Sequence, residues 1–205
     1  MYLSRVELNI SNRETMRAIV SPKIFHGAVE NSFDGNRRRK LWRIDNLNGR
    51  KYILILSEDI PNLETFAVKF GFEGKYETKD YSSLLNKISN GGIWHFRLTA
   101  NPVVKSDGKV MAHVGSYYQK KWLLDRAESK GFLLNDNDFQ IVYSTWYDFY
   151  KKSGDGSCRV RMMSVTFEGV LQVTDAEKFK EILCCGIGRE KAYGQGLITV
   201  VGVGK

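Results

Sequence analysis

The titratable side chain with the most suggestive neighbours is His26. A helix is expected from Pro22 onward, with Phe25 on its apolar face and His26 about 100° away, at the margin of that face. Lys23 and Glu30 are its i−3 and i+4 neighbours, so a cation and a carboxylate could both influence its protonation. This spacing puts an imidazole at the surface, where it could act as a general acid or base or could simply be solvated.

A glycine-rich segment near the end of the sequence, GIGREKAYGQG at residues 186–196, could bind an anion. Glycine adopts positive φ at no steric cost and lets the backbone approach a ligand, so amide groups can converge on a phosphate. The residues predicted to bind phosphate here are Gly186, Gly188, Gly194, Gly196, Arg189 and Lys191. The alternative is a purely structural turn, because glycine is also common between a helix and a strand. The order of helix, glycines and strand is the reverse of a dinucleotide fingerprint and excludes a Rossmann site.

The charge of the chain favours a polyanionic partner. Its 205 residues include 31 Lys and Arg against 23 Asp and Glu, which gives a net charge of +8. The densest basic run supplies further candidate phosphate contacts, namely Arg37, Arg38, Arg39 and Lys40. No amphipathic basic helix of the lipid-binding kind stands out, so nucleic acid is favoured over a membrane surface.

Composition also argues against several kinds of site. Three cysteines, two of them adjacent, offer little to a zinc site or a disulfide framework, and we expect them to be reduced. The sequence has no HExxH, P-loop or G-x-S-x-G motif and no cluster of Asp and Glu, so neither a metal nor a cofactor is expected. No apolar run reaches membrane-spanning length and the first residues include charges, which predicts a cytoplasmic protein.

The expected elements follow the order βαββαβ in each half of the chain. In the first half, strands are expected over 2–10, 41–45, 52–56 and 75–81, and helical segments from 11 to the interruption at Ser21-Pro22, over 23–33 and over 63–70. In the second half, strands are expected over 93–104, 139–149, 159–173 and 197–203, and helices over 117–130 and 175–185. This repeat predicts an α+β protein made of two tandem ferredoxin-like domains, residues 1–88 and 89–205.

Six stretches of the sequence, spread in order over nearly the whole chain, resemble one family. They are MYLSRVEL, SPKIFHGAV, LWRID, HFRLTANPVV, VTFEGVLQV and GIGREKAYGQGL. Together they are similar to the CRISPR-associated endoribonuclease of the type I-E Cascade system, which cuts precursor CRISPR RNA within each repeat. The most specific pieces are FRLTANP, FEGVL and the terminal glycine loop.

The resemblance implies two ferredoxin-like domains, metal-independent cleavage beside a repeat hairpin, and retention of the product RNA with other Cascade subunits. Matched by motif, His26 is the catalytic histidine and the terminal glycine loop supports RNA binding. The chain departs from the pattern at Lys23, since relatives can carry a tyrosine three residues before that histidine. Lys23 could instead act on phosphate charge or could be solvated.

The chemistry of RNA cleavage agrees with this interpretation. RNA supplies its own nucleophile, the 2′-OH, so a base, an acid and a phosphate held in line suffice, and His26 could be either base or acid. Arg159, as a catalytic electrostatic group, and Arg161, as an RNA contact, are candidates because they open a strand after the flexible residues 151–156. Exposed strand charges are the alternative for both. A non-catalytic RNA-binding Cascade subunit and a module for protein contacts are the rival hypotheses.

Overall fold

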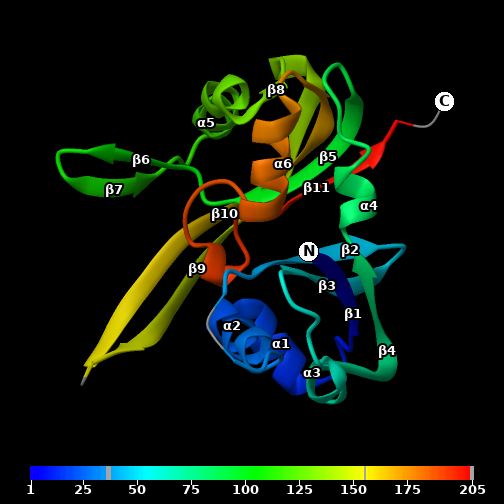
Figure 1. Ribbon diagram of the computed structural model, residues 1–205. Helices are drawn as coiled ribbons and strands as arrows, with labels where there is room; N and C mark the ends of the chain where they lie inside the picture. The colour runs from blue at the N-terminus through cyan, green and yellow to red at the C-terminus, as the bar shows by residue number, and fades with distance from the viewer. Residues whose placement is uncertain (36–37, 155, 204–205) are drawn as a thin grey trace.

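The computed structural model describes residues 1–35, 38–154 and 156–203, and the first half of the chain forms an antiparallel sheet packed against helices (Figure 1). Its elements are β1 (Tyr2–Leu8), α1 (Arg13–Val20), α2 (Pro22–Glu30), β2 (Leu41–Leu47), β3 (Arg50–Ser57), α3 (Glu64–Phe70), β4 (Gly71–Asp80) and the short α4 (Ser82–Leu85). The strands lie in the order β2-β3-β1-β4, and neighbouring strands are antiparallel. This is the arrangement of a ferredoxin-like unit.

The second half repeats this plan with additions. Its elements are β5 (Ile93–Ala100), β6 (Val103–Ser106), β7 (Lys109–Ala112), α5 (Ser116–Ala127), η1 (Glu128–Lys130), β8 (Phe132–Leu133), η2 (Asp136–Asp138), β9 (Phe139–Ser153), β10 (Gly156–Val173), α6 (Ala176–Cys185), η3 (Lys191–Tyr193) and β11 (Ile198–Gly202). The sheet order is β11-β5-β10-β8, and β9 also pairs with β10. The α+β class and the two ferredoxin-like units are therefore confirmed. The predicted boundary between residues 88 and 89 falls in the connection from α4 to β5.

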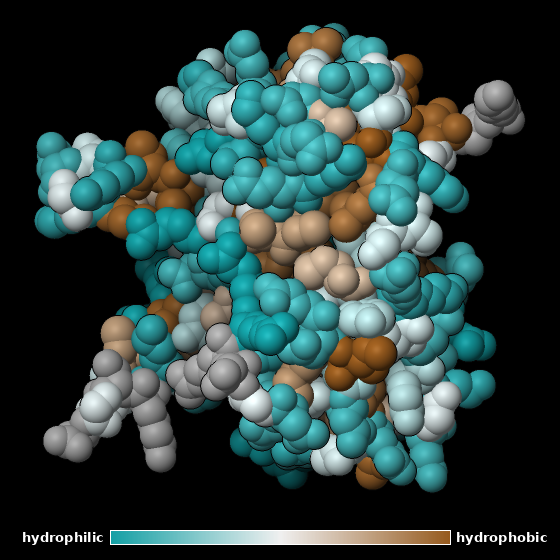
Figure 2. All heavy atoms as spheres, in the orientation of Figure 1, coloured by the Kyte–Doolittle hydropathy of each residue, from teal (hydrophilic) through white to brown (hydrophobic). Residues whose placement is uncertain are grey.

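A hairpin that the sequence analysis did not predict projects from the second unit. The strand expected over 93–104 is divided, because β5 ends at Ala100 and a separate strand, β6, begins at Val103. The chain turns at Asp107 and Gly108, whose φ angles are 49° and 75°, and returns as β7. Two successive residues with positive φ are what a type I′ hairpin turn requires. Figure 2 shows hydrophobic residues gathered where this hairpin joins the body of the molecule.

The long hairpin of β9 and β10 also differs from expectation. Residues 151–153 and 156, expected in a flexible segment, belong to paired strands, with Ser153 opposite Gly156. Arg159 lies opposite Tyr150 and forms an ion pair with Asp148, its diagonal neighbour on the other strand. Such cross-strand pairs stabilise a two-stranded ribbon and help to extend the pairing beyond the sheet.

Helix α2 is held by the aromatic core of the first unit. Phe25 is fully buried, and its ring lies 5.9 Å from that of Trp42 and 5.2 Å from that of Phe70, measured between centroids. Val29, one turn later, is buried against the same core, which confirms the predicted apolar face. This packing fixes the rotation of α2, so that His26 stays at the half-exposed margin.

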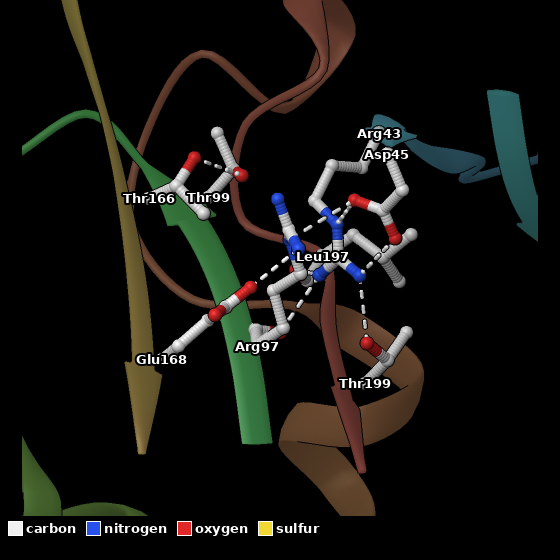
Figure 3. Close-up of polar contacts among 8 residues, drawn as sticks. All are labelled: Arg43, Asp45, Arg97, Thr99, Thr166, Glu168, Leu197 and Thr199. Atoms are coloured by element: carbon white, nitrogen blue, oxygen red, sulfur yellow. Dashed lines mark hydrogen bonds and ion pairs between the residues drawn. The ribbon is translucent and has the colours of Figure 1, made fainter. Parts of the chain in front are cut away.

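A buried arginine on β2 joins the two sheets (Figure 3). The side chain of Arg43 is 1% exposed, and its guanidinium makes a two-pronged contact with Asp45, with both N–H···O distances 2.7 Å. Its remaining donors bind the carbonyls of Arg97 and Leu197, at 2.7 and 2.9 Å, and the hydroxyl of Thr199, at 2.7 Å. All five guanidinium donors therefore have acceptors, as a buried cation requires.

The network continues across the second sheet. Arg97 forms ion pairs with Asp45, at 3.3 Å, and with Glu168 on β10. Beside it, the hydroxyls of Thr99 and Thr166 are hydrogen-bonded at 2.8 Å (Figure 3). Charged and polar groups thus connect β2 of the first unit with β5, β10 and β11 of the second, and they set how the two sheets meet.

Replacing Arg43 with Met is expected to lower the free energy of unfolding by about 3–5 kcal/mol, because Asp45 stays buried without its main partner. Denaturant unfolding followed by circular dichroism measures this loss. The matched control is Arg5→Met, whose ion pair with Glu77 is exposed and should be worth less than about 1 kcal/mol. Equal losses in the two variants would contradict the structural role assigned to Arg43.

Candidate active site

His26 lies where three separate parts of the chain meet. Its ring contacts the ring of Tyr193, from η3 in the glycine loop, in an edge-to-face arrangement with centroids 5.9 Å apart. Tyr193 is 8% exposed and packs in the same manner on Phe149 of β9, at 4.9 Å. The imidazole is therefore held on one side by an aromatic pair from the second unit, while α2 supplies it from the first.

The two charged neighbours of His26 on α2 are engaged elsewhere. The ammonium of Lys23 donates a hydrogen bond of 2.6 Å to the carbonyl of Tyr150 on β9. Glu30 accepts a hydrogen bond of 2.9 Å from Lys40. Lys23 is exposed but not merely solvated, because it attaches the β9–β10 hairpin to the helix that carries His26.

The two candidate arginines lie on the hairpin that Lys23 contacts. Arg159 is exposed and binds Asp148 through two hydrogen bonds of 2.8 and 2.5 Å, which lower the pKa of the Asp148 carboxyl. Its position opposite Tyr150 places it beside the residue that Lys23 contacts. Arg161, also exposed, lies over the ring of Trp146 at 4.7 Å. Both arginines alternate with Val160 and Met162, which pack with Tyr193, so their side chains lie on the opposite face of the ribbon and are not brought against His26.

The predicted basic run divides into residues with different environments. Arg37 lies outside the described residues. Arg38 is exposed and pairs with Glu58 and Asp59, at 3.3 and 3.2 Å. The side chain of Lys40 is only 5% exposed, and its charge is compensated by Glu30, so in this conformation it is not placed to contact a phosphate.

Arg39 extends the basic run toward the glycine loop. It is exposed, and the pKa of Lys191 is lowered by burial and, to a smaller extent, by the charge of Arg39. Lys191 donates a hydrogen bond of 2.7 Å to the carbonyl of Cys185 at the end of α6. Two cations that are distant in sequence therefore lie near each other, and such a pair favours a bound anion.

Most of the glycine loop is not free to cradle a phosphate. The amides of Gly186, Gly194 and Gly196 donate to backbone carbonyls of the chain itself, at 2.8, 3.3 and 2.6 Å. Gly188 and Arg189 are exposed, whereas Gly194 and Gly196 are buried. The predicted cradle of converging amides is therefore wrong for these three glycines in this conformation.

The glycines are required for close packing instead. Each of the four has a positive φ, between 71° and 90°. A Cβ on Gly194 would lie 2.7 Å from the ring of Trp42, and one on Gly186 or Gly196 would lie 2.7 or 2.6 Å from a backbone oxygen. The indole of Trp42 also donates to the carbonyl of Ala192, at 3.1 Å. The loop is thus a rigid support that places Tyr193 beside His26.

Sequence reasoning missed this role of Tyr193 and the tie made by Arg43. The signals were present, because Tyr193 lies within the glycine segment and Arg43 and Asp45 alternate with apolar residues in LWRID. Alternation places both charges on one face of β2, but only the tertiary structure shows that this face is buried. Contacts between the two halves have no local sequence signal.

The residues that the structure describes include no group of side chains suited to bind a metal ion and no helix suited to span a membrane. Within 1–35, 38–154 and 156–203, no three His, Cys, Asp or Glu side chains are grouped closely enough to hold a metal ion. Cys158, Cys184 and Cys185 are unpaired thiols. The helices described are too short or too polar to span a bilayer.

Comparison with known proteins places this geometry in a family. A family model described as "CRISPR associated protein" matches residues 1–201. The chain belongs to this family. The family resemblance seen in the sequence motifs is thereby confirmed.

Individual relatives match this CRISPR-associated protein over nearly the full length of both chains. The chain is 28% identical to the CRISPR-associated endoribonuclease Cse3 of Thermus thermophilus, over 98% of its own length and 99% of that protein. A structure of the endoribonuclease Cse3 bound to a 19-nucleotide RNA matches with a TM-score of 0.79 and 27% identity, covering 98% of this chain and 100% of that one. A chain from a CRISPR RNA-guided surveillance complex in a pre-nicking state shares the fold, with a TM-score of 0.72, 20% identity, and coverage of 99% and 100%.

Replacing Gly194 with Ala tests the support role of the loop. We expect a loss of about 2–4 kcal/mol, from positive φ and from overlap with Trp42, measured by denaturant unfolding. Gly49→Ala is the matched control, since Gly49 has the same φ of 77° with nothing within 4 Å of an added Cβ. It should lose only about 1–2 kcal/mol. If both variants lose the same free energy of unfolding, the packing of Gly194 on Trp42 does not support the loop.

Proposed function

We propose that this chain is a metal-independent endoribonuclease that cleaves precursor CRISPR RNA in its repeat hairpin. The product RNA stays bound in Cascade with the other subunits, in the cytoplasm. Family membership, 28% identity to an endoribonuclease and a structural match to an RNA-bound relative support this proposal. The observation that carries it is the position of His26, half-exposed and supported by Tyr193, beside a hairpin that bears exposed arginines.

The reaction requires one bond to form and one to break at a single phosphorus. The 2′-oxygen loses its proton and attacks the adjacent phosphate, and the 5′-oxygen of the next nucleotide leaves and takes up a proton. The products are a 2′,3′-cyclic phosphate and a 5′-OH. His26 can serve this reaction by accepting the first proton or by donating the second, and either role is worth about 10² to 10⁴ in rate.

Positive side chains of the β9–β10 hairpin and the glycine loop would hold the phosphate and stabilise its developing charge. Arg159 is the catalytic candidate, because its exposed pair with Asp148 can exchange for a phosphate at little cost. The direct RNA contacts that we propose are Arg38, Arg39, Arg161, Gly188, Arg189 and Lys191. Gly186, Gly194 and Gly196 would act through the shape of the loop, and Lys40 through its pair with Glu30.

A second candidate function is that of an RNA-binding Cascade subunit without cleavage. It is favoured by Lys23, which stands where relatives can carry a tyrosine and whose ammonium is bound to Tyr150. In that case the same basic surface would hold the RNA, but His26 would transfer no proton to or from it. Both functions predict that the chain binds the repeat RNA, but only the first predicts that it cleaves this RNA.

Incubation with a CRISPR repeat hairpin in excess EDTA separates them. We expect cleavage by the unmodified chain, and a fall of about 10² to 10⁴ in the single-turnover rate for His26→Ala with RNA affinity retained. His95→Ala is the matched control, because His95 is exposed on β5, and it should cleave normally. Unchanged cleavage by His26→Ala would remove this residue from the mechanism.

The nucleophile is tested on the RNA rather than on the protein. A single 2′-deoxy substitution at the cleaved nucleotide removes the attacking oxygen and leaves the phosphate in place. We expect cleavage to be abolished while the RNA still binds, as measured by gel analysis and by fluorescence anisotropy. Cleavage of the 2′-deoxy RNA would exclude an internal nucleophile.

A further inference from the structure

A cavity of about 630 Å³ lies between the β6–β7 hairpin and α5, away from the contacts of His26. Its lining is aromatic and basic, and includes His113, Tyr117, Tyr118, Lys121 and Arg126. A second cavity of about 210 Å³ shares Arg126 with the first and is also lined by Gly188 and Arg189 of the glycine loop. The two cavities form one concave surface that leads from the projecting hairpin to the loop.

The aromatic rings of this surface are not used by the core. Helix α5 buries Trp122 and Leu123, whereas Tyr117 and Tyr118 are 70% and 57% exposed. The ring of Tyr118 is stacked on that of His113, with centroids 5.9 Å apart and planes 11° apart. Exposed flat rings are what unpaired bases stack on, and such stacking does not depend on base identity.

The charges of the surface favour a polyanion over a protein helix. Lys121 is paired with Asp125, at 2.7 Å. Lys105, Arg126 and Arg189 form no ion pair with any residue that the structure describes. The guanidinium of Arg126 is partly buried and lies 4.3 Å from the ring centre of Trp122. Cations interleaved with exposed aromatic rings are typical of sites for single-stranded nucleic acid.

We propose that this surface binds single-stranded RNA that flanks the repeat hairpin, with bases on Tyr117 and Tyr118 and phosphates on the free cations. The inference rests on the proposed function and gives it a second RNA site. The glycine loop connects the two sites, because Arg189 lines the cavity and Tyr193 contacts His26. Four residues of chain span at most about 14 Å, so an RNA strand leaving the cleavage site can reach the cavity.

Binding of uncleavable RNAs tests this site. Three RNAs with a 2′-deoxy nucleotide at the cut are compared, namely the bare hairpin, the hairpin with a 5′ flank and the hairpin with a 3′ flank. For the unmodified chain, we expect one flank to raise affinity at least about fivefold, the effect of one stacked base. The Tyr117→Ala, Tyr118→Ala double variant should lose this gain while its affinity for the bare hairpin is unchanged. The flank that shows the effect identifies which side of the hairpin is bound.

Two controls keep the result specific. The Tyr117→Phe, Tyr118→Phe double variant keeps the rings and should keep the gain in affinity from the flank. Tyr76→Ala removes a ring that is 39% exposed on the other unit, and it should leave that gain unchanged. The inference is overturned if neither flank raises affinity. It is also overturned if the double Ala variant keeps the gain in affinity, even where that variant fails to assemble with effector subunits. Cleavage is measured separately on ribose RNA, so a failure of His26 to act would refute the proposed function without affecting the flank measurement.

Discussion

The buried guanidinium of Arg43 is the contact on which the arrangement of the molecule depends. Removing a cation and a carboxylate from water is costly, and this cost is offset only when every donor finds an acceptor. Here the acceptors come from β2 itself, from β5 and from the start of β11, so the ion pair is satisfied only when the two sheets meet in one way. A polar contact thus specifies the geometry between two units that also share apolar packing, since Leu41 and Leu56 of the first unit belong to the core cluster of the second.

The same strand also determines the surroundings of His26. Trp42, next to Arg43, packs on Gly194 and binds the carbonyl of Ala192, so β2 fixes the glycine loop as well as the sheets. The loop then places Tyr193 against His26. The candidate active site is therefore composite, with the imidazole on the first unit and its aromatic support on the second. Neither half of the chain holds the complete site.

Local patterns allowed the sequence to predict part of this arrangement. The spacing of Phe25 and Val29 predicted the apolar face of α2 and the marginal position of His26, because helical periodicity depends only on neighbours along the chain. The β6–β7 hairpin was missed although Asp107-Gly108 is a strong turn signal, since the apolar run before it was taken as one strand. The ties of Arg43, and the contact of Lys23 with Tyr150, join residues more than fifty positions apart and could not be predicted from periodicity.

The glycine segment shows how one composition can have two physical meanings. Flexible glycines suggested amides open to a phosphate, but positive φ and contact with Trp42 or with neighbouring backbone explain them better. Gly186, Gly194 and Gly196 are consequently closed to a larger side chain, whereas Arg189, Lys191 and Ala192 between them carry side chains without a positive φ. A lineage could therefore vary the charge and shape of that short interval, and with it the choice of nucleic acid, while the frame around it stays invariant.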